Sequence, residues 1–202
     1  MYYVADIFAS AIQYENRTGL CDMVLSDGWK EDPIQRLHDF AYDIGVWIDD
    51  YDANQGTVRN LLIRSDVAIR QWTWQYCTEW GFFQEPNVYY PMRSARLTHD
   101  WFLGYCRRVF GDDVPAPQAA AVNYKFGGLN NNGTNIVFNN AIEDPWQYAG
   151  MRKVHDPAVQ TSIVTNLIDC TDCAHCVDML PDAATDPPAL TKARQDTWAQ
   201  LD

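Results

Sequence analysis

The spacing of apolar residues predicts two helices near the start of the chain. The first covers residues 1–14, where apolar side chains recur at helical intervals: Val4, Ile7, Phe8, Ala11 and Ile12. A loop that contains Gly19 and Cys21 is expected to follow, up to about Lys30. The second helix should begin at Asp32-Pro33, an N-cap candidate followed by proline at the first helical position, and continue to about Tyr51.

Further along, the pattern changes from helical to alternating helix and strand. Residues 65–90 are aromatic and are predicted to be irregular, and a helix is expected from Thr98 to Phe110. Short apolar strands are predicted at Thr134–Phe138 and Ser162–Ile168. Asp186 should cap a final helix with an apolar face, formed by Leu190, Ala193, Thr197 and Leu201. This order is typical of the end of an α/β sheet, so the predicted fold class is α/β.

Composition and charge narrow the class of protein. Hydrophobic residues make up 47% of the 202 residues, which is a globular composition. The net charge of −12 disfavours binding to phosphate backbones, so nucleic acid is not an expected partner. No run of apolar residues approaches the length of a membrane span.

Cysteines and sequons point to an oxidising compartment. Six cysteines are more than most cytosolic domains of this size carry, and sequons occur at Asn16 and Asn132. The first residues lack the basic start of a signal peptide. We therefore expect a secreted, lysosomal or vacuolar glycoprotein whose signal peptide lies on an upstream segment.

Two residues that follow the predicted strands have the chemistry of a hydrolase triad. Asp144 comes after the strand at 134–138, and His175 comes after the strand at 162–168. Sites of open α/β sheets lie at the carboxyl ends of strands, and in α/β-hydrolases the triad order is Ser, Asp, His. From the pattern alone, an aspartate before proline is often a turn former, and a loop histidine is more often a surface residue than a base.

Several spaced blocks of the chain resemble one family. TNIVFNNAIEDPW (134–146) and AHCVDM (174–179) resemble the aspartate and histidine segments of the prolyl carboxypeptidase family of serine peptidases, which includes dipeptidyl peptidase II and the thymus-specific serine protease. QWTWQYCTEWGFFQ (71–84) is similar to a further signature block of that family. Residues 4–21 resemble the end of its helical insertion, and residues 186–194 its final helix.

The resemblance implies a fold and a set of roles. Residues 1–65 would be the end of a helical insertion, or cap, and residues 66–202 the carboxyl-terminal part of an α/β-hydrolase domain. Asp144 would be the triad acid and His175 the general base. The resemblance also implies that Trp146 lines the substrate pocket and that Glu79 faces the cleft. It implies a disulfide between Cys77 and Cys106 and a bond from Cys21 to an upstream partner.

The family's nucleophile is missing from this chain. None of its serines (Ser10, Ser26, Ser65, Ser94 and Ser162) lies in a Gly-x-Ser-x-Gly motif. We expect a serine exopeptidase acting on peptides, either a carboxypeptidase or a dipeptidyl peptidase, whose serine lies on an amino-terminal segment or partner chain. The 202-residue chain alone would then be inactive. A catalytically inactive fragment that binds peptide or protein is the alternative.

Other interpretations remain open for individual residues. Trp146 is equally explained as a core residue, and Glu79 as an ion-pair partner of an arginine such as Arg70. A disulfide within Cys170-x-x-Cys173-x-x-Cys176 would brace the histidine loop. The same three cysteines with His175 would otherwise be a zinc site, although the chain lacks a second Cys pair. No metal or cofactor is expected on the triad interpretation.

Overall fold

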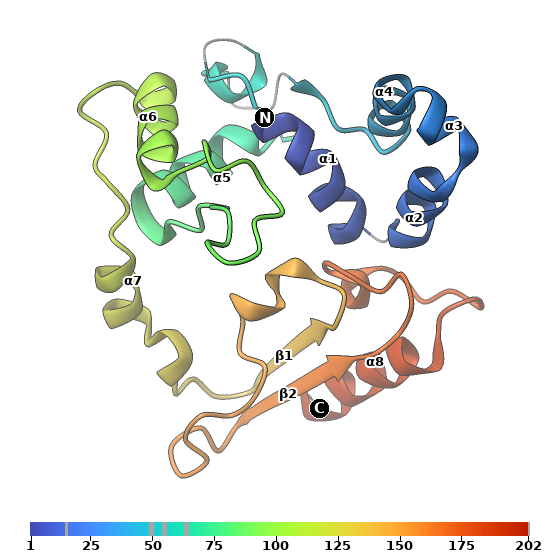
Figure 1. Ribbon diagram of the computed structural model, residues 1–202. Coiled ribbons are helices and arrows are strands. Elements are labelled where there is room, and N and C mark those ends of the chain that lie inside the picture. The colour runs from blue at the N-terminus through green and yellow to red at the C-terminus, as the bar shows by residue number, and fades with distance from the viewer. Residues whose placement is uncertain (15, 49–50, 54–55, 63–64, 202) are drawn as a thin grey trace. The chain divides into compact units, whose positions relative to one another are not determined.

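The computed structural model combines helices with a short parallel sheet (Figure 1). It describes residues 1–202 except 15, 49–50, 54–55, 63–64 and 202. The helices are α1 (Tyr2–Gln13), α2 (Arg17–Leu25), α3 (Asp27–Glu31), α4 (Pro33–Asp43), α5 (Ile69–Gln75), α6 (His99–Phe110), α7 (Ala119–Phe126) and α8 (Pro188–Leu201). The strands are β1 (Ile136–Ala141) and β2 (Ile163–Ile168).

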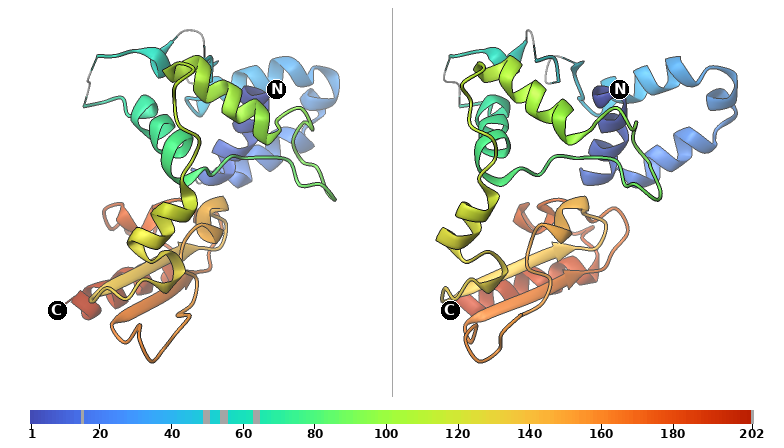
Figure 2. Two further views of the ribbon diagram at one scale, coloured as in Figure 1. Left: turned by 90° about the vertical axis from the view of Figure 1, so that its left-hand side faces the viewer. Right: turned by 60° about the vertical axis from the view of Figure 1, so that its left-hand side comes forward.

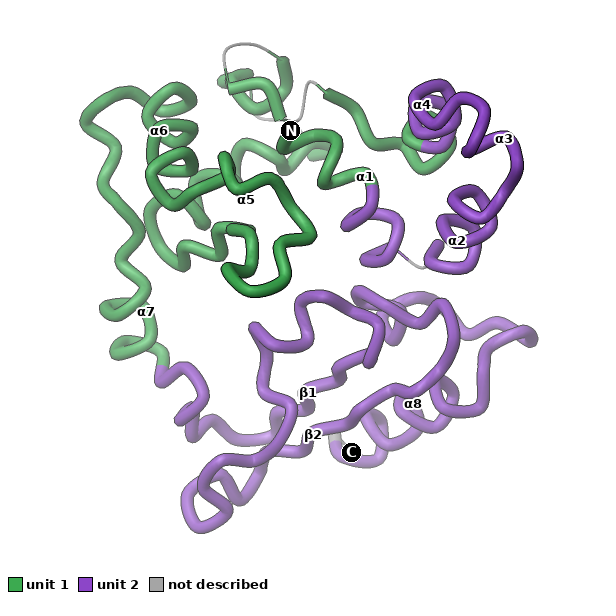
Figure 3. Tube along the Cα trace, viewed as in Figure 1, with its two compact units in different colours: residues 1–7, 41–126 green, residues 8–40, 127–202 purple. Residues whose placement is uncertain are grey.

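The described residues form two compact units (Figure 3). The first unit contains residues 1–7 and 41–126, and the second contains residues 8–40 and 127–202. The division does not follow the predicted boundary at residue 65. The assignment of residues 1–65 to a helical insertion therefore stays a prediction.

The first unit is built around α5, α6 and a buried disulfide. Cys77 lies in a π-helical turn, Tyr76–Trp80, that continues α5, and it is bonded to Cys106 of α6. Both cysteines are buried in a cluster with Val58, Tyr105 and Val109. Aromatic side chains complete the core; for example, the rings of Phe83 and Phe102 stack with their centroids 5.0 Å apart.

Helix α6 begins and ends where its terminal residues dictate. The Thr98 hydroxyl accepts a hydrogen bond from the Trp101 N–H at 3.2 Å, which satisfies one of the open donors of the first turn. Gly111 follows the last residue with a φ of 104°, a conformation that favours glycine. The helix predicted at Thr98–Phe110 is thus confirmed.

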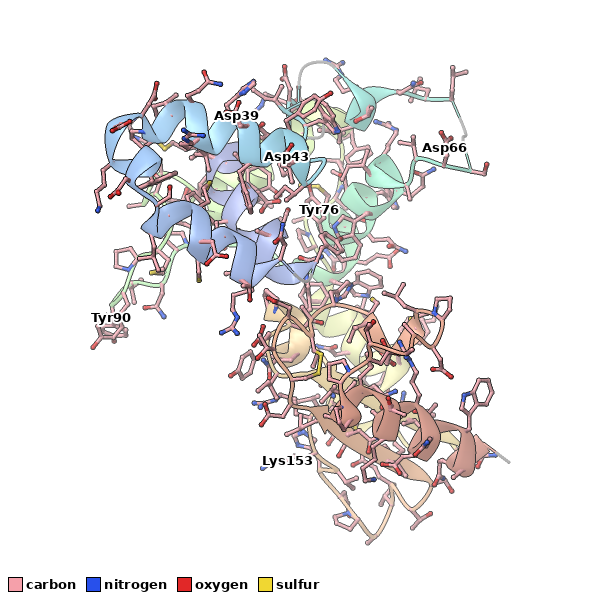
Figure 4. All side chains as sticks on the ribbon, turned by 90° about the vertical axis from the view of Figure 1, so that its right-hand side faces the viewer. Asp39, Asp43, Asp66, Tyr76, Tyr90 and Lys153 are labelled. Carbon is pink, nitrogen blue, oxygen red and sulfur yellow. A yellow bond between two sulfur atoms is a disulfide. The ribbon has the colours of Figure 1, made fainter. Side chains whose placement is uncertain are left out.

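The loop between the π-helical turn and α6 of the first unit exposes apolar side chains at its far end. Figure 4 shows Tyr90 at the far end of this loop, whereas Tyr76 lies among the side chains next to α5. Tyr76 is 7% exposed and Tyr90 is 81% exposed. Val88, Tyr89 and Met92 are also exposed, so this end of the loop contributes little to the core.

The second unit contains the parallel sheet and the helix that covers it. β1 pairs with β2 in register from Ile136 opposite Ile163 to Ala141 opposite Ile168. Helix α8 lies along both strands in the two views of Figure 2, where it is red. Its Leu190 and Ala193 are buried with Ala141 and Ile168. The predicted apolar face of this helix is confirmed for Leu190 and Ala193.

Polar side chains also join the strands to their neighbours. Asn166 of β2 donates to Asn139 of β1 at 2.9 Å, and Asn139 in turn donates to Asp178 at 2.8 Å and to Thr197 of α8 at 2.9 Å. Buried amides are favourable only when they are paired in this way. Asn140 is likewise paired, with the Met151 carbonyl at 2.9 Å.

The structure corrects several predicted segments. The loop expected after the first helix, up to about Lys30, contains α2 and α3, because the Ser26 side chain caps a new helical turn by accepting from the Trp29 N–H. The irregular segment expected at 65–90 contains α5 and the π-helical turn. Its helical period was hidden because aromatic residues occupy both the buried and the exposed positions.

Two boundaries and one whole helix also differ from the prediction. Helix α4 ends at Asp43 rather than near Tyr51, since Gly45 adopts a φ of 70° soon after its end. Residues 49–50 of the predicted extension lie outside the described residues. β1 ends at Ala141 rather than at residue 138, because the paired amides Asn139 and Asn140 are strand residues. Helix α7 was not predicted.

We expect the Cys77–Cys106 disulfide to contribute more stability than the Cys170–Cys173 disulfide. The two bonds join cysteines separated by 29 and by 3 residues. The chain-entropy model gives about 3.5 kcal/mol for the longer loop and about 2 kcal/mol for the shorter one. Urea denaturation of the paired serine variants of each bond measures both values. Equal losses of unfolding free energy would show that loop length does not determine the contribution of each disulfide.

Candidate active site

Local sequence fixes the position of Asp144 just past the end of β1. The Asp144 N–H donates to the Ala141 carbonyl at 3.1 Å, which closes a turn directly after the strand. One carboxylate oxygen, Oδ1, accepts from the Trp146 N–H at 2.7 Å. Asp144 is therefore the N-cap of the 3-10 helix Pro145–Tyr148, with proline at its first position.

His175 lies in a short loop that follows β2. A disulfide between Cys170 and Cys173 closes a small ring just before it. Cys173 and Ala174 are buried, whereas the His175 side chain is 33% exposed. Cys176 then turns the chain with a φ of 64° into the 3-10 helix Val177–Met179. The disulfide expected to brace the histidine loop is thus the one between Cys170 and Cys173.

The structure brings Asp144 and His175 into direct contact. His175 Nδ1 lies 2.9 Å from Asp144 Oδ2, and the Asp144 side chain is only 11% exposed. Because a carboxylate only accepts hydrogen bonds, Nδ1 carries the proton, and Nε2 of a neutral ring is left as the acceptor. This is the tautomer that a general base needs.

Gln13, at the end of α1, contacts both segments. Its backbone carbonyl accepts from the His175 N–H at 2.9 Å. Its side-chain Oε1 accepts from the indole Nε1 of Trp146 at 2.8 Å. The ring of the neighbouring Tyr14 meets the His175 ring edge-on, with centroids 6.2 Å apart. The sequence around Gln13 carries no signal of these contacts, because its partners are 133 and 162 residues away along the chain.

A second group of contacts lies next to the pair. Glu143 forms an ion pair with Arg17 at 3.1 Å and accepts from the Asp172 N–H at 3.1 Å. Asp172 accepts from the Thr18 N–H at 2.9 Å. Hydrogen bonding from Thr18 lowers the pKa of Asp172, against the smaller opposing effect of partial burial.

Arg194 of α8 supports the turn that follows His175. Its guanidinium donates to the carbonyls of Val177, at 2.8 Å, and Asp178, at 3.1 Å, and also pairs with Asp182 and Asp186. Hydrogen bonding from the Ala183 N–H and from Arg194 lowers the pKa of Asp186. The residue is buried, so its five donors need these partners.

The remaining predicted site residues have varied surroundings. Trp146 is half-buried and hydrogen-bonded to Gln13. Glu79 is half-buried in the π-helical turn of the first unit. Arg70 donates to the Val58 carbonyl and lies over the Phe110 ring, so it has partners other than Glu79. The roles predicted for Trp146 and Glu79 stay predictions.

Sequons and the other cysteines lie at the surface. Asn132 is exposed in the loop before β1, and Asn16 is half-buried at the start of α2. Cys21 and Cys176 are exposed. The disulfide occupies two of the three sulfurs that the zinc alternative requires, and within the described residues no group of three His, Cys, Asp or Glu side chains is arranged to hold a metal.

Asp144 and His175 form a hydrogen-bonded pair that follows two adjacent parallel strands, which is the arrangement expected of the last two members of a hydrolase triad. In the described part of the chain, no serine is hydrogen-bonded to His175. The chain belongs to the serine carboxypeptidase S28 family, whose model matches residues 7–197.

Curated relatives extend this match across several kingdoms. The chain is 31% identical over 186 residues to a probable serine protease of Arabidopsis thaliana, covering 89% of this chain and 36% of the relative. It is 32% identical over 142 residues to the human thymus-specific serine protease, covering 68% of this chain and 26% of the relative. A probable extracellular serine carboxypeptidase of Arthroderma benhamiae is 29% identical over 91 residues, 43% of this chain and 12% of the relative.

These relatives are much longer than the chain. The 202 residues span about a third or less of the length of the curated relatives described above. No solved structure matches the chain. None of the helices in the described residues has the length and apolar character needed to cross a membrane.

We expect the stability contributed by Asp172 to depend on pH. Its pKa is lowered in the folded state, so its contribution is present above the usual carboxyl pKa of about 3.9 and is lost as the pH falls through the folded value. Asp172→Asn should therefore lower the urea midpoint at pH 7 and leave it unchanged near pH 2. Because the carboxylate is largely solvated, the difference at pH 7 should stay below about 1 kcal/mol.

The matched control is Asp22→Asn, an exposed carboxylate on α2 of the same unit. A pH-independent loss in the Asp172 variant, or an equal pH-dependent loss in the Asp22 variant, would contradict the assignment.

Proposed function

We propose that this chain supplies the acid and the base of a serine peptidase, Asp144 and His175, to a nucleophilic serine that lies outside the 202 residues. The observation that carries the proposal is the 2.9 Å contact between His175 Nδ1 and Asp144 Oδ2. It leaves the ring with an acceptor on Nε2, which would take the proton of the serine hydroxyl. Membership of the serine carboxypeptidase S28 family gives this chemistry its reaction class.

We also propose that the chain is part of an α/β-hydrolase fold. The pair follows two adjacent parallel strands, in the chain order of the last two triad members of an α/β-hydrolase. Helix α8 covers the strands, as a helix following the last strand of such a sheet would. We therefore assign residues 66–202 to the carboxyl-terminal part of an α/β-hydrolase domain and residues 1–65 to the end of its helical insertion.

Peptides are the proposed substrates. The relatives are named as serine proteases and as a serine carboxypeptidase, so the scissile bond is proposed to lie near a chain end. Trp146 is held beside the acid and, in this proposal, lines the pocket for the residue before that bond. Glu79, in the first unit, is proposed separately as a substrate-pocket residue. A flat aromatic wall suits proline, which would make the enzyme proline-directed.

The proposed location is outside the cytosol. Two disulfides and the sequons at Asn16 and Asn132 are suited to the secretory pathway, with a secreted, lysosomal or vacuolar destination. Exposed Cys21 is the proposed attachment point for the segment or chain that bears the serine.

We expect His175→Ala and Asp144→Asn to abolish hydrolysis in the enzyme assembled with its serine-bearing segment. The first change removes the base, and the second removes the group that fixes its tautomer, so kcat should fall by about 10³-fold or more. Peptide hydrolysis is the measurement. His155→Ala, an exposed histidine of the same unit, is the control and should retain full activity.

Intact mass spectrometry with a fluorophosphonate label tests the missing nucleophile. A labelled second segment, released by reduction of a Cys21 disulfide, would support the proposal. If native material contains only the 202-residue chain and nothing is labelled, the chain is a binding fragment with an unused acid–base pair.

We also expect Trp146→Ala to reduce selectivity for proline. Loss of the indole would remove a packing surface that favours one residue, so the ratio of kcat/KM for proline over alanine before the scissile bond should fall by about tenfold. Paired peptides that differ only at that residue provide the measurement. An unchanged ratio of kcat/KM would show that Trp146 is a core residue and does not select proline.

A further inference from the structure

The end of α1 and the start of α2 reach both segments that carry the acid–base pair. Three residues of this region make four contacts within the second unit: Gln13, Arg17 and Thr18. Gln13 bonds to Trp146 and to the backbone of His175, Arg17 pairs with Glu143, and Thr18 bonds to Asp172. Each of the two segments is therefore held at two points by a third part of the chain.

Gln13 has the most direct geometry of the three. Its carbonyl holds the backbone N–H of the base itself, at 2.9 Å. Its side chain holds the indole of Trp146 at 2.8 Å, and the Trp146 N–H in turn donates to Asp144 Oδ1 at 2.7 Å. Gln13 thus joins His175 to the short 3-10 helix that Asp144 caps.

The contact between Asp144 and His175 depends on more than their own side chains. Asp144 Oδ1 is already committed to the Trp146 N–H, so a movement of Trp146 rotates the carboxylate and carries Oδ2 away from Nδ1. A misplacement of about 1 Å at a catalytic group can lower a rate by about 10²-fold.

We propose that Gln13 is a positioning residue that holds the acid and the base in register by fixing Trp146 through its side chain and His175 through its backbone. This inference rests on the proposed function of the pair. Arg17 and Thr18 act in parallel, through Glu143 and Asp172, which are themselves joined by the Asp172 N–H at 3.1 Å. Gln13 acts only through these partners and takes no proton.

The test removes the side-chain acceptor of Gln13. Gln13→Met keeps the length of the side chain and the backbone carbonyl but removes the amide acceptor of the Trp146 indole. Gln13→Glu restores an acceptor at the same reach. Gln35→Met is the matched control, because Gln35 is an exposed amide on α4 of the same unit that bonds to Asp39.

The first readout is the NMR signal of the His175 Nδ1 proton in the 202-residue chain. We expect Gln13→Met to shift or broaden this signal, Gln13→Glu to restore it, and Gln35→Met to leave it unchanged. A signal in Gln13→Met identical to that of the unmodified chain would overturn the inference, whether or not the chain is ever assembled into an active enzyme. Urea denaturation verifies that each variant is folded.

The second readout is kinetic, in the assembled enzyme. We expect Gln13→Met to lower kcat by about tenfold while KM changes less than threefold, and the effect should vanish when Trp146→Phe has already removed the indole donor. A loss confined to KM, or an equal loss in the Trp146→Phe background, would overturn the positioning role. Full hydrolysis by Asp144→Asn would instead overturn the proposed function, which separates the two failures.

Discussion

The parallel pairing of β1 with β2 is the constraint on which the site depends. Parallel neighbours end at the same edge of a sheet, so residues that follow them are delivered to one place. Ala141 and Ile168 are partners at that edge, and Asp144 and His175 lie a few residues beyond them. An antiparallel arrangement would have placed the two side chains at opposite ends of the strands.

Beyond the strands, different local devices hold the two side chains. Asp144 is fixed as a helix cap, since its carboxylate accepts from the backbone N–H two residues ahead. His175 is fixed by the disulfide just before it and by the buried Arg194, which donates hydrogen bonds to carbonyls of the following turn. One oxygen of Asp144 thus maintains the local fold while the other is available to the histidine.

The sequence predicted the elements with strong local signals and missed those that depend on distant partners. The strands, α1, α6 and α8 follow from apolar spacing. The cap predicted at Asp186 is wrong, because α8 begins at Pro188 and the Asp186 side chain accepts from the Ala183 N–H instead. Asp144 and His175 follow from strand order together with the family resemblance. Helix α5 was missed because its many aromatic residues obscured the helical period. Gln13 could not be found, since nothing in its neighbourhood distinguishes it from an ordinary polar helix residue; its partners become visible only when residues 13, 146 and 175 are brought together.

The amide pair across the strands has a consequence for alignment. Asn139 lies opposite Asn166, and their hydrogen bond, anchored to Asp178 and Thr197, is satisfied only in the observed register. A slip of one strand by one residue would place the two amides on opposite faces of the sheet and shift that strand by about 3.3 Å along the other. That distance exceeds the whole span of the contact between His175 and Asp144. The two asparagines therefore select one strand register, and a sheet in another register would lack the contact between Asp144 and His175.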